Sequence, residues 1–190
     1  MSAPRRVAVL IGSLRAESIN RKLATALARM LPANVVFEHV DIGSLPLYNQ
    51  DHDASPSPQA VRLKQEIEAA DAVLFVTPEY NRSMPGVLKN AIDIASRPYG
   101  KNSFAGKPAG VIGASGGAIG TALAQQHLRN VIAYLDMPTL NQPEAYVKFP
   151  EGLVGPGGEI TEASTARFLQ GWLDAYLAWI ERCLVPVNRP

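Results

Sequence analysis

Short apolar runs alternate along the chain with longer stretches in which apolar residues recur at helical spacing. The short runs are rich in Val, Ile and Phe, and turn-forming or charged residues flank them. Largely continuous apolarity, rather than strict alternation with polar residues, is typical of strands buried on both faces of a sheet. The predicted strands are Val7–Ile11, Val35–Val40, Ala72–Val76 and Ala109–Ile112.

Five stretches between and after these runs predict helices. The clearest start is Ser57-Pro58, where a serine that can cap a helix precedes a proline at the first helical position. The predicted helices are Asn20–Leu31, Gln59–Ala70, Val87–Ser96, Ile119–Leu135 and Thr161–Leu184.

The alternation of strands and helices predicts a parallel sheet covered by helices on both faces. A short apolar segment near Thr139–Leu140 is expected to add a fifth strand, and the Pro- and Gly-rich segment Pro143–Glu159 is expected to be a loop. Five strands fit a flavodoxin-like sheet of order 2-1-3-4-5 better than a six-stranded Rossmann sheet. We expect one domain over residues 1–190, because the last ~30 residues form one helix and cannot build a core alone.

Composition and charge exclude several classes of protein. Eighteen Lys and Arg against seventeen Asp and Glu give a net charge of +1, which argues against a nucleic-acid binder, and 47% hydrophobic residues argue against disorder. Cys183 is the only cysteine, so the chain can form neither an internal disulfide nor a thiolate zinc cluster. No apolar run reaches the length of a membrane span, and Val7–Ile11 is too short for the core of a signal peptide. We therefore expect a cytoplasmic protein.

The first strand is followed by a loop, residues 12–20, with the chemistry of an anion site. In open parallel sheets, ligands bind beyond the carboxyl ends of the strands. The loop has no dinucleotide or Walker fingerprint. It does carry the hydroxyls of Ser13 and Ser18 and the guanidinium of Arg15 before a predicted helix, whose N-terminus favours an anion. This predicts a monophosphate site; the alternative is a serine-rich turn in which Ser18 is an ordinary helix cap.

The loop after the third strand, Thr77–Gly86, suits an aromatic ligand. Tyr80 can present a flat face to such a ligand, and Asn81 can donate hydrogen bonds to carbonyls or ring nitrogens. Surface packing of Tyr80 and a solvated charge pair between Glu79 and Arg82 account for the same residues equally well.

The loop after the fourth strand, residues 113–120, contains four glycines, which allow close approach of the backbone to a ligand. Gly113, Ser115 and Gly117 also match the G-x-S-x-G nucleophile pattern. A hydrolase triad requires a later histidine in a loop, but the one histidine after Ser115 is His127, inside a predicted helix. We therefore interpret this loop as a backbone cradle and not as a hydrolase site.

The predicted loops supply no evident nucleophile, metal cluster or acid–base pair. The three histidines of the chain are scattered without the spacing of a metal site. A ligand site without reactive groups of its own indicates that a bound cofactor performs the chemistry.

Three segments of the chain form a recognisable set: Gly12-Ser-Leu-Arg15 with Ser18 and Asn20, Pro78-Glu-Tyr-Asn81, and Ser83-x-Pro-Gly86-x-Leu-Lys-Asn90-Ala-x-Asp93. They resemble segments of the NAD(P)H-dependent FMN reductases, the flavodoxin-like quinone, chromate and azo-dye reductases. The resemblance covers roughly residues 6–147 and departs from the family at Ile94, where many relatives have tryptophan.

Carried over by position, the resemblance implies two groups of FMN-binding residues. The phosphate is expected to be held by Ser13, Leu14, Arg15, Ser18 and Asn20. The isoalloxazine ring is expected to lie between Pro78, Glu79, Tyr80, Asn81 and Arg82 on one side and Ser115, Gly116 and Gly117 on the other.

The resemblance also implies the activity. NAD(P)H is expected to reduce FMN, and an acceptor is then expected to take the electrons from the same flavin face, which gives ping-pong kinetics. The acceptor is a quinone or a similar compound, such as chromate, an azo compound or free flavin. Tyr48 is expected at the rim of the acceptor pocket. A homodimer or homotetramer is implied, with Arg129 and Glu144 as either cross-subunit partners or solvated surface charges.

Two other functions fit the same fold. A non-catalytic flavodoxin-type electron carrier is one, although such carriers are strongly acidic and this chain has a net charge of +1. An FMN-binding regulatory protein is the other, because fold alone does not determine turnover.

Overall fold

The computed structural model describes residues 3–185. Its strands and helices alternate as the sequence pattern predicts, with bounds that differ by one to three residues from most of those expected. In chain order the elements are β1 (Arg5–Ile11), α1 (Ile19–Arg29), β2 (Val35–Val40), the 3-10 helix η1 (Gln50–His52), α2 (Pro58–Ala69), β3 (Ala72–Val76), α3 (Gly86–Ala95), β4 (Ala109–Ser115), α4 (Ala122–Tyr134), β5 (Tyr146–Lys148) and α5 (Ala163–Leu184).

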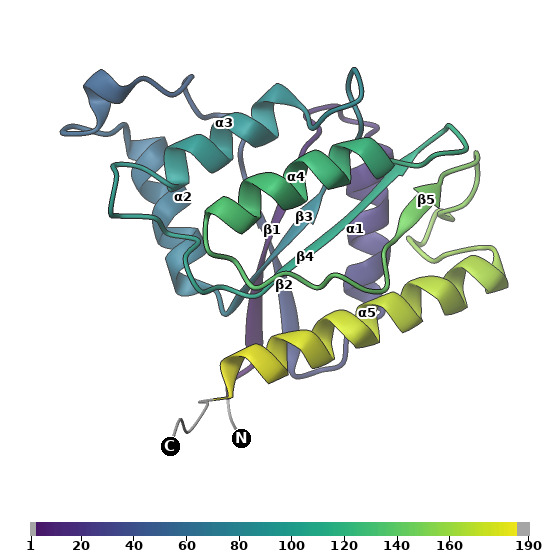
Figure 1. Cartoon of the computed structure of the whole chain (residues 1–190). Coiled ribbons are helices and arrows are strands. Elements are labelled where there is room, and N and C mark those ends of the chain that lie inside the picture. Colours follow the sequence, from purple (N-terminus) through teal and green to yellow (C-terminus); the bar gives the residue numbers. More distant parts are fainter. Residues whose placement is uncertain (1–2, 186–190) are drawn as a thin grey trace.

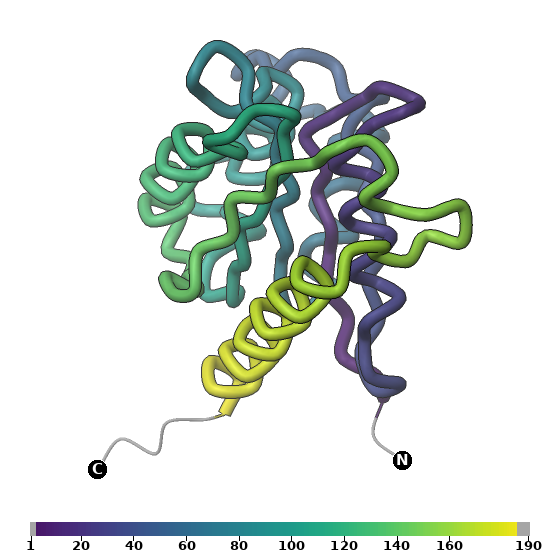
Figure 2. The backbone as a smooth tube through the Cα atoms, turned by 90° about the vertical axis from the view of Figure 1, so that its right-hand side faces the viewer, coloured from purple at the N-terminus to yellow at the C-terminus, as the bar shows by residue number. Residues whose placement is uncertain are grey.

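The five strands form one parallel sheet in the order β2-β1-β3-β4-β5, which confirms the predicted flavodoxin-like topology. Helices α1 and α5 cover one face of the sheet, and α2, α3 and α4 cover the other (Figures 1 and 2). Among the described helices, none is both long enough and apolar enough to cross a bilayer.

The central strand β3 shows why the apolar runs are continuous. Successive side chains of a strand point to opposite faces of the sheet. Val73 and Phe75 pack against α2, α3 and α4, whereas Leu74 and Val76 pack against α1 and α5. All five residues of β3 are buried, so every position of the strand contributes to one of two cores.

The fifth strand is not where the sequence pattern placed it. Thr139 forms only an isolated parallel bridge with Ala109, and the strand proper is Tyr146–Lys148, inside the segment Pro143–Glu159 that was expected to be a loop. The physical reason is that the proline ring of Pro143 fixes φ outside the range of a regular strand, so the chain leaves β4 after the bridge and pairs with it again beyond the proline.

Helix α5 packs unusually close to the sheet over Gly110. The rings of Trp172 and Tyr176 are stacked with their centroids 5.5 Å apart, and both side chains are buried. A Cβ atom on Gly110 would lie 2.7 Å from the ring of Tyr176, closer than real Cβ contacts allow. Glycine at this position therefore sets the distance between helix and sheet.

The substitution Gly110→Ala is expected to lower the free energy of unfolding by about 1–3 kcal/mol, because overpacking forces the buried Tyr176 ring to move. Gly171→Ala is the matched control, since a Cβ there meets no atom within 4 Å and alanine favours a helix by about 0.5–1 kcal/mol. Urea unfolding of both variants measures the difference. Equal stability of the two variants would contradict the close contact over Gly110.

Candidate functional site

The loops after β1, β3 and β4 meet at the carboxyl end of the sheet, toward which the strand arrows point (Figure 1). Their backbones lie very close together. A Cβ on Gly12 would lie 3.2 Å from Cδ of Pro78, and a Cβ on Gly113 would lie 2.1 Å from the carbonyl oxygen of Thr77. The two glycines therefore bring three predicted ligand loops into one region.

The loop after β1 presents hydrogen-bond donors at the start of α1. Ser13 and Ser18 are buried, with 5% and 3% of their surface exposed, whereas Leu14 and Arg15 are exposed. Ser18 Oγ accepts from the N–H of Arg21 (3.2 Å), so Ser18 is a helix cap, while its own hydroxyl hydrogen can still be donated. Buried hydroxyls, free N–H groups of the first helical turn and a nearby guanidinium are a donor set that fits a phosphate.

Asn20 has a structural role that its sequence position does not reveal. Its Oδ1 accepts from the N–H of Ala114 (2.9 Å), and its Nδ2 donates to the carbonyl oxygen of Ala114 (2.9 Å). These buried hydrogen bonds tie α1 to the end of β4, two elements that are distant in sequence. One N–H of the amide is left, so the role of Asn20 in binding phosphate stays a prediction.

The segment Tyr80–Ser83 is a tight turn closed by two backbone hydrogen bonds, from the N–H of Tyr80 to the oxygen of Ser83 (2.9 Å) and from the N–H of Ser83 to the oxygen of Tyr80 (3.0 Å). Asn81 and Arg82 at its tip have φ angles of 50° and 65°. Left-handed conformations are uncommon for residues other than glycine and concentrate at functional sites. Tyr80 is 49% exposed and available to a ligand.

Glu79 does not form a solvated pair with Arg82 in the described part of the chain. Its Oε2 instead accepts from the backbone N–H groups of Leu123 (3.0 Å) and Ala124 (3.1 Å) in the first turn of α4. The loop after β3 is thereby anchored to a helix that begins after β4.

Ser115 shapes the glycine loop. Its hydroxyl donates to the carbonyl oxygen of Gly120 (2.6 Å), and its Oγ accepts from the N–H of Gly117 (3.2 Å). His127 is hydrogen-bonded elsewhere, with Nδ1 3.0 Å from Oγ of Ser83. Ser115 is therefore not paired with His127 as a nucleophile would be. The neighbouring Gly116 is exposed, and a Cβ there would meet no atom within 4 Å.

The segment after β2 is anchored by Asn90 of α3, a residue to which the sequence analysis gave no role. Asn90 Oδ1 accepts from the N–H of Tyr48 (2.8 Å), and its Nδ2 donates to the carbonyl oxygen of Pro46 (2.9 Å). Its importance could have been inferred from the sequence, because Asn90 lies within Ser83–Asp93, a segment that carries the family resemblance.

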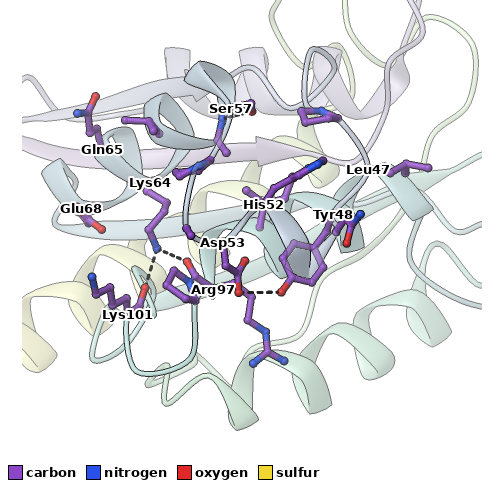
Figure 3. A pocket seen from close by; sticks show the side chains of 18 residues that line it. Leu47, Tyr48, His52, Asp53, Ser57, Lys64, Gln65, Glu68, Arg97 and Lys101 are labelled. Atoms are coloured by element: carbon purple, nitrogen blue, oxygen red, sulfur yellow. Dashed lines mark hydrogen bonds between the residues drawn. The ribbon is translucent and has the colours of Figure 1, made fainter.

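Tyr48 lines a separate cavity of about 470 Å³ between α2, the segment after β2 and residues 97–101 (Figure 3). Its hydroxyl lies 3.4 Å from Oδ2 of Asp53. Lys64 Nζ donates to the carbonyl oxygen of Ala95 (3.0 Å), the last residue of α3, and to those of Arg97 (2.9 Å) and Lys101 (2.7 Å) in the segment that follows. Burial lowers the pKa of this ammonium. None of the residues expected to bind FMN lines this cavity.

Comparison with known proteins gives one family. A family model described as NADPH-dependent FMN reductase matches residues 5–151. The chain is 53% identical over 175 residues to a 2-hydroxy-1,4-benzoquinone reductase of Burkholderia sp, covering 92% of this chain and 96% of that protein. It is 47% identical over 182 residues to a quinone reductase of Pseudomonas putida, covering 95% and 97%.

A solved structure is similar as well. FerB, a flavoenzyme NAD(P)H:(acceptor) oxidoreductase from Paracoccus denitrificans, superimposes with a TM-score of 0.91 at 48% identity, covering 94% of this chain and 98% of that one. The likeness extends beyond the fold, because nearly half of the aligned residues are identical.

The substitution Asn20→Ala is expected to lower the free energy of unfolding of the FMN-free protein by about 2–4 kcal/mol, because it leaves the buried N–H and carbonyl of Ala114 without partners. Urea unfolding measures this. Ser18→Ala is the control at the same helix end and is expected to cost about 1 kcal/mol as a lost cap. Unchanged stability of Asn20→Ala would show that its amide does not hold α1 to β4.

Proposed function

The chain belongs to the NADPH-dependent FMN reductase family, and we propose that it passes electrons from NAD(P)H to quinones at an FMN bound where the loops after β1, β3 and β4 meet. As a member of this family it is an FMN-dependent NAD(P)H oxidoreductase. The observation that carries the proposed site is the pair of buried hydroxyls before α1, on a loop that approaches the loop carrying the exposed Tyr80 at Gly12 and Pro78.

The phosphate is held at the start of α1. The hydroxyls of Ser13 and Ser18, the backbone of Leu14 and the remaining N–H of Asn20 donate to its oxygens, and the guanidinium of Arg15 balances its charge. The dipole of α1 favours the anion further.

The isoalloxazine ring is held between the other two loops. When bound, FMN accepts a hydride from NAD(P)H and delivers electrons to an acceptor. The protein's part is to bind and orient the ring and to supply backbone N–H donors, because the site offers no acid–base pair of its own. The residues assigned to this task are Pro78, Glu79, Tyr80, Asn81 and Arg82 on one side and Ser115, Gly116 and Gly117 on the other.

Quinones are the acceptors we favour. Proteins 53% and 47% identical to this chain are described as quinone reductases, and the exposed Tyr80 turn and Gly116 leave room for a flat acceptor. The same open edge is compatible with chromate, azo compounds and free flavin.

We propose further that the chain acts as one domain over residues 1–190, in a cytoplasmic homodimer or homotetramer. The need for NAD(P)H supports the location. Large apolar side chains exposed near both ends of α4, Ile119 (52%) and Tyr134 (78%), support association. Within one chain, Nε of Arg129 lies 4.0 Å from Oε1 of Glu144. Nη1 of Arg129 also donates to the carbonyl oxygen of Leu140 (2.8 Å), so this arginine has contacts without a partner subunit.

The purified protein is expected to be yellow and to oxidise NAD(P)H when a benzoquinone is present. Absorption spectra show the flavin, and loss of NAD(P)H absorbance measures turnover. Parallel double-reciprocal plots are expected, since both substrates use one flavin face. A colourless protein, or bound FMN without turnover, would contradict the proposed function.

The substitution Arg15→Ala is expected to raise the dissociation constant of FMN about 10- to 150-fold, as a lost charge-assisted hydrogen bond contributes about 1.5–3 kcal/mol. Fluorescence of FMN released on dilution measures the constant. Arg29→Ala, at the opposite end of α1, is the control and is expected to bind FMN as the unmodified protein does. Equal dissociation constants for Arg15→Ala and Arg29→Ala would show that Arg15 does not bind the phosphate.

A further inference from the structure

Helix α4 is capped by a residue from a different loop. Thr121 occupies the cap position but makes no capping hydrogen bond, and its buried Oγ1 accepts from Nε2 of Gln125 (3.0 Å). The free N–H groups of Leu123 and Ala124 are satisfied by the carboxylate of Glu79. These are the second and third N–H groups of the helix, the ones that a local cap would normally take.

A third hydrogen bond joins the same loop to the same helix. Ser83 Oγ lies 3.0 Å from Nδ1 of His127, which is one turn further along α4 than Leu123. The Tyr80–Ser83 turn is thus attached to α4 through Glu79, which precedes it, and through Ser83 at its end.

The turn needs external support. Asn81 and Arg82 both have positive φ angles, which side chains other than glycine adopt at a cost in free energy. Such conformations persist when the surrounding structure holds them. Within the described residues, the contacts that Glu79 and Ser83 make with α4 provide this support.

We propose that Glu79 is a positioning residue for the flavin ring: its carboxylate caps α4 and thereby fixes the Tyr80–Ser83 turn against which the ring binds. This inference rests on the proposed function. The carboxylate is taken up by helix N–H groups at the positive end of α4, so its negative charge is balanced without a basic side chain. Glu79 acts on the ring through the backbone that it holds.

Three variants test the inference by the dissociation constant of FMN and the visible circular dichroism of the bound flavin, both measured on the full-length protein. Glu79→Ala removes the cap and is expected to raise the constant about tenfold and to change the dichroism. Glu79→Gln keeps an oxygen for the two N–H groups but loses the charge, so an intermediate constant with native dichroism is expected. Ser83→Ala removes the second attachment, and a rise of about threefold is expected.

Glu162 provides the matched control. Its carboxylate caps α5 in the same way, accepting from the N–H groups of Ser164 (3.0 Å) and Thr165 (2.8 Å). Glu162 does not belong to any of the loops after β1, β3 and β4. Glu162→Ala is expected to lose helix-cap stability while binding FMN as the unmodified protein does.

The outcomes separate the two proposals. If Glu79→Ala binds FMN with an unchanged constant and dichroism, or if Glu162→Ala weakens FMN binding equally, the positioning role is wrong. If Glu79→Ala does not fold, Glu79→Gln and Ser83→Ala decide, because unchanged constants in both would overturn the inference. If the unmodified protein itself does not bind FMN, the proposed function fails, and the inference with it.

Discussion

Burial of the central strand on both faces is the constraint on which the molecule depends. All five residues of β3 are inside, with α1 and α5 over one face of the sheet and α2, α3 and α4 over the other. A sheet covered in this way offers no face to a ligand, and open parallel sheets as a class bind their ligands at the carboxyl end, where the loops emerge. The close approach of Gly12 to Pro78 and of Gly113 to Thr77 then sets the distance between those loops.

The ends of the helices complete this arrangement. Every helix begins with N–H groups that lack partners inside the helix, and the chain satisfies them in different ways. Ser18 and Ser57 cap α1 and α2 locally, Glu162 caps α5, and α4 depends on Glu79 from another loop. Capping by a distant residue links the loop after β3 to the start of α4, so the stability of this helix and the position of that loop depend on one interaction.

Patterns along the chain were sufficient to predict most of the strands and helices, because continuous apolar runs and helical spacing report burial directly, and the number of strands then indicated the order of the sheet. They did not find β5, since three residues between two prolines are too short to show a period. Nor could they reveal what Glu79 and Asn20 contact. Their partners lie 44 and 94 residues away, and only the packed fold brings them together. The family resemblance pointed to the residues but not to these contacts.

The left-handed backbone at Arg82 also limits how the protein can change. A positive φ is tolerated by glycine, asparagine and aspartate but is strongly disfavoured for β-branched side chains. The substitutions that this exposed position accepts are therefore limited first by whether the new residue can adopt a positive φ. A library that replaces Arg82 should accordingly draw on small, flexible or polar residues, and valine, isoleucine and threonine should be depleted among the variants that fold.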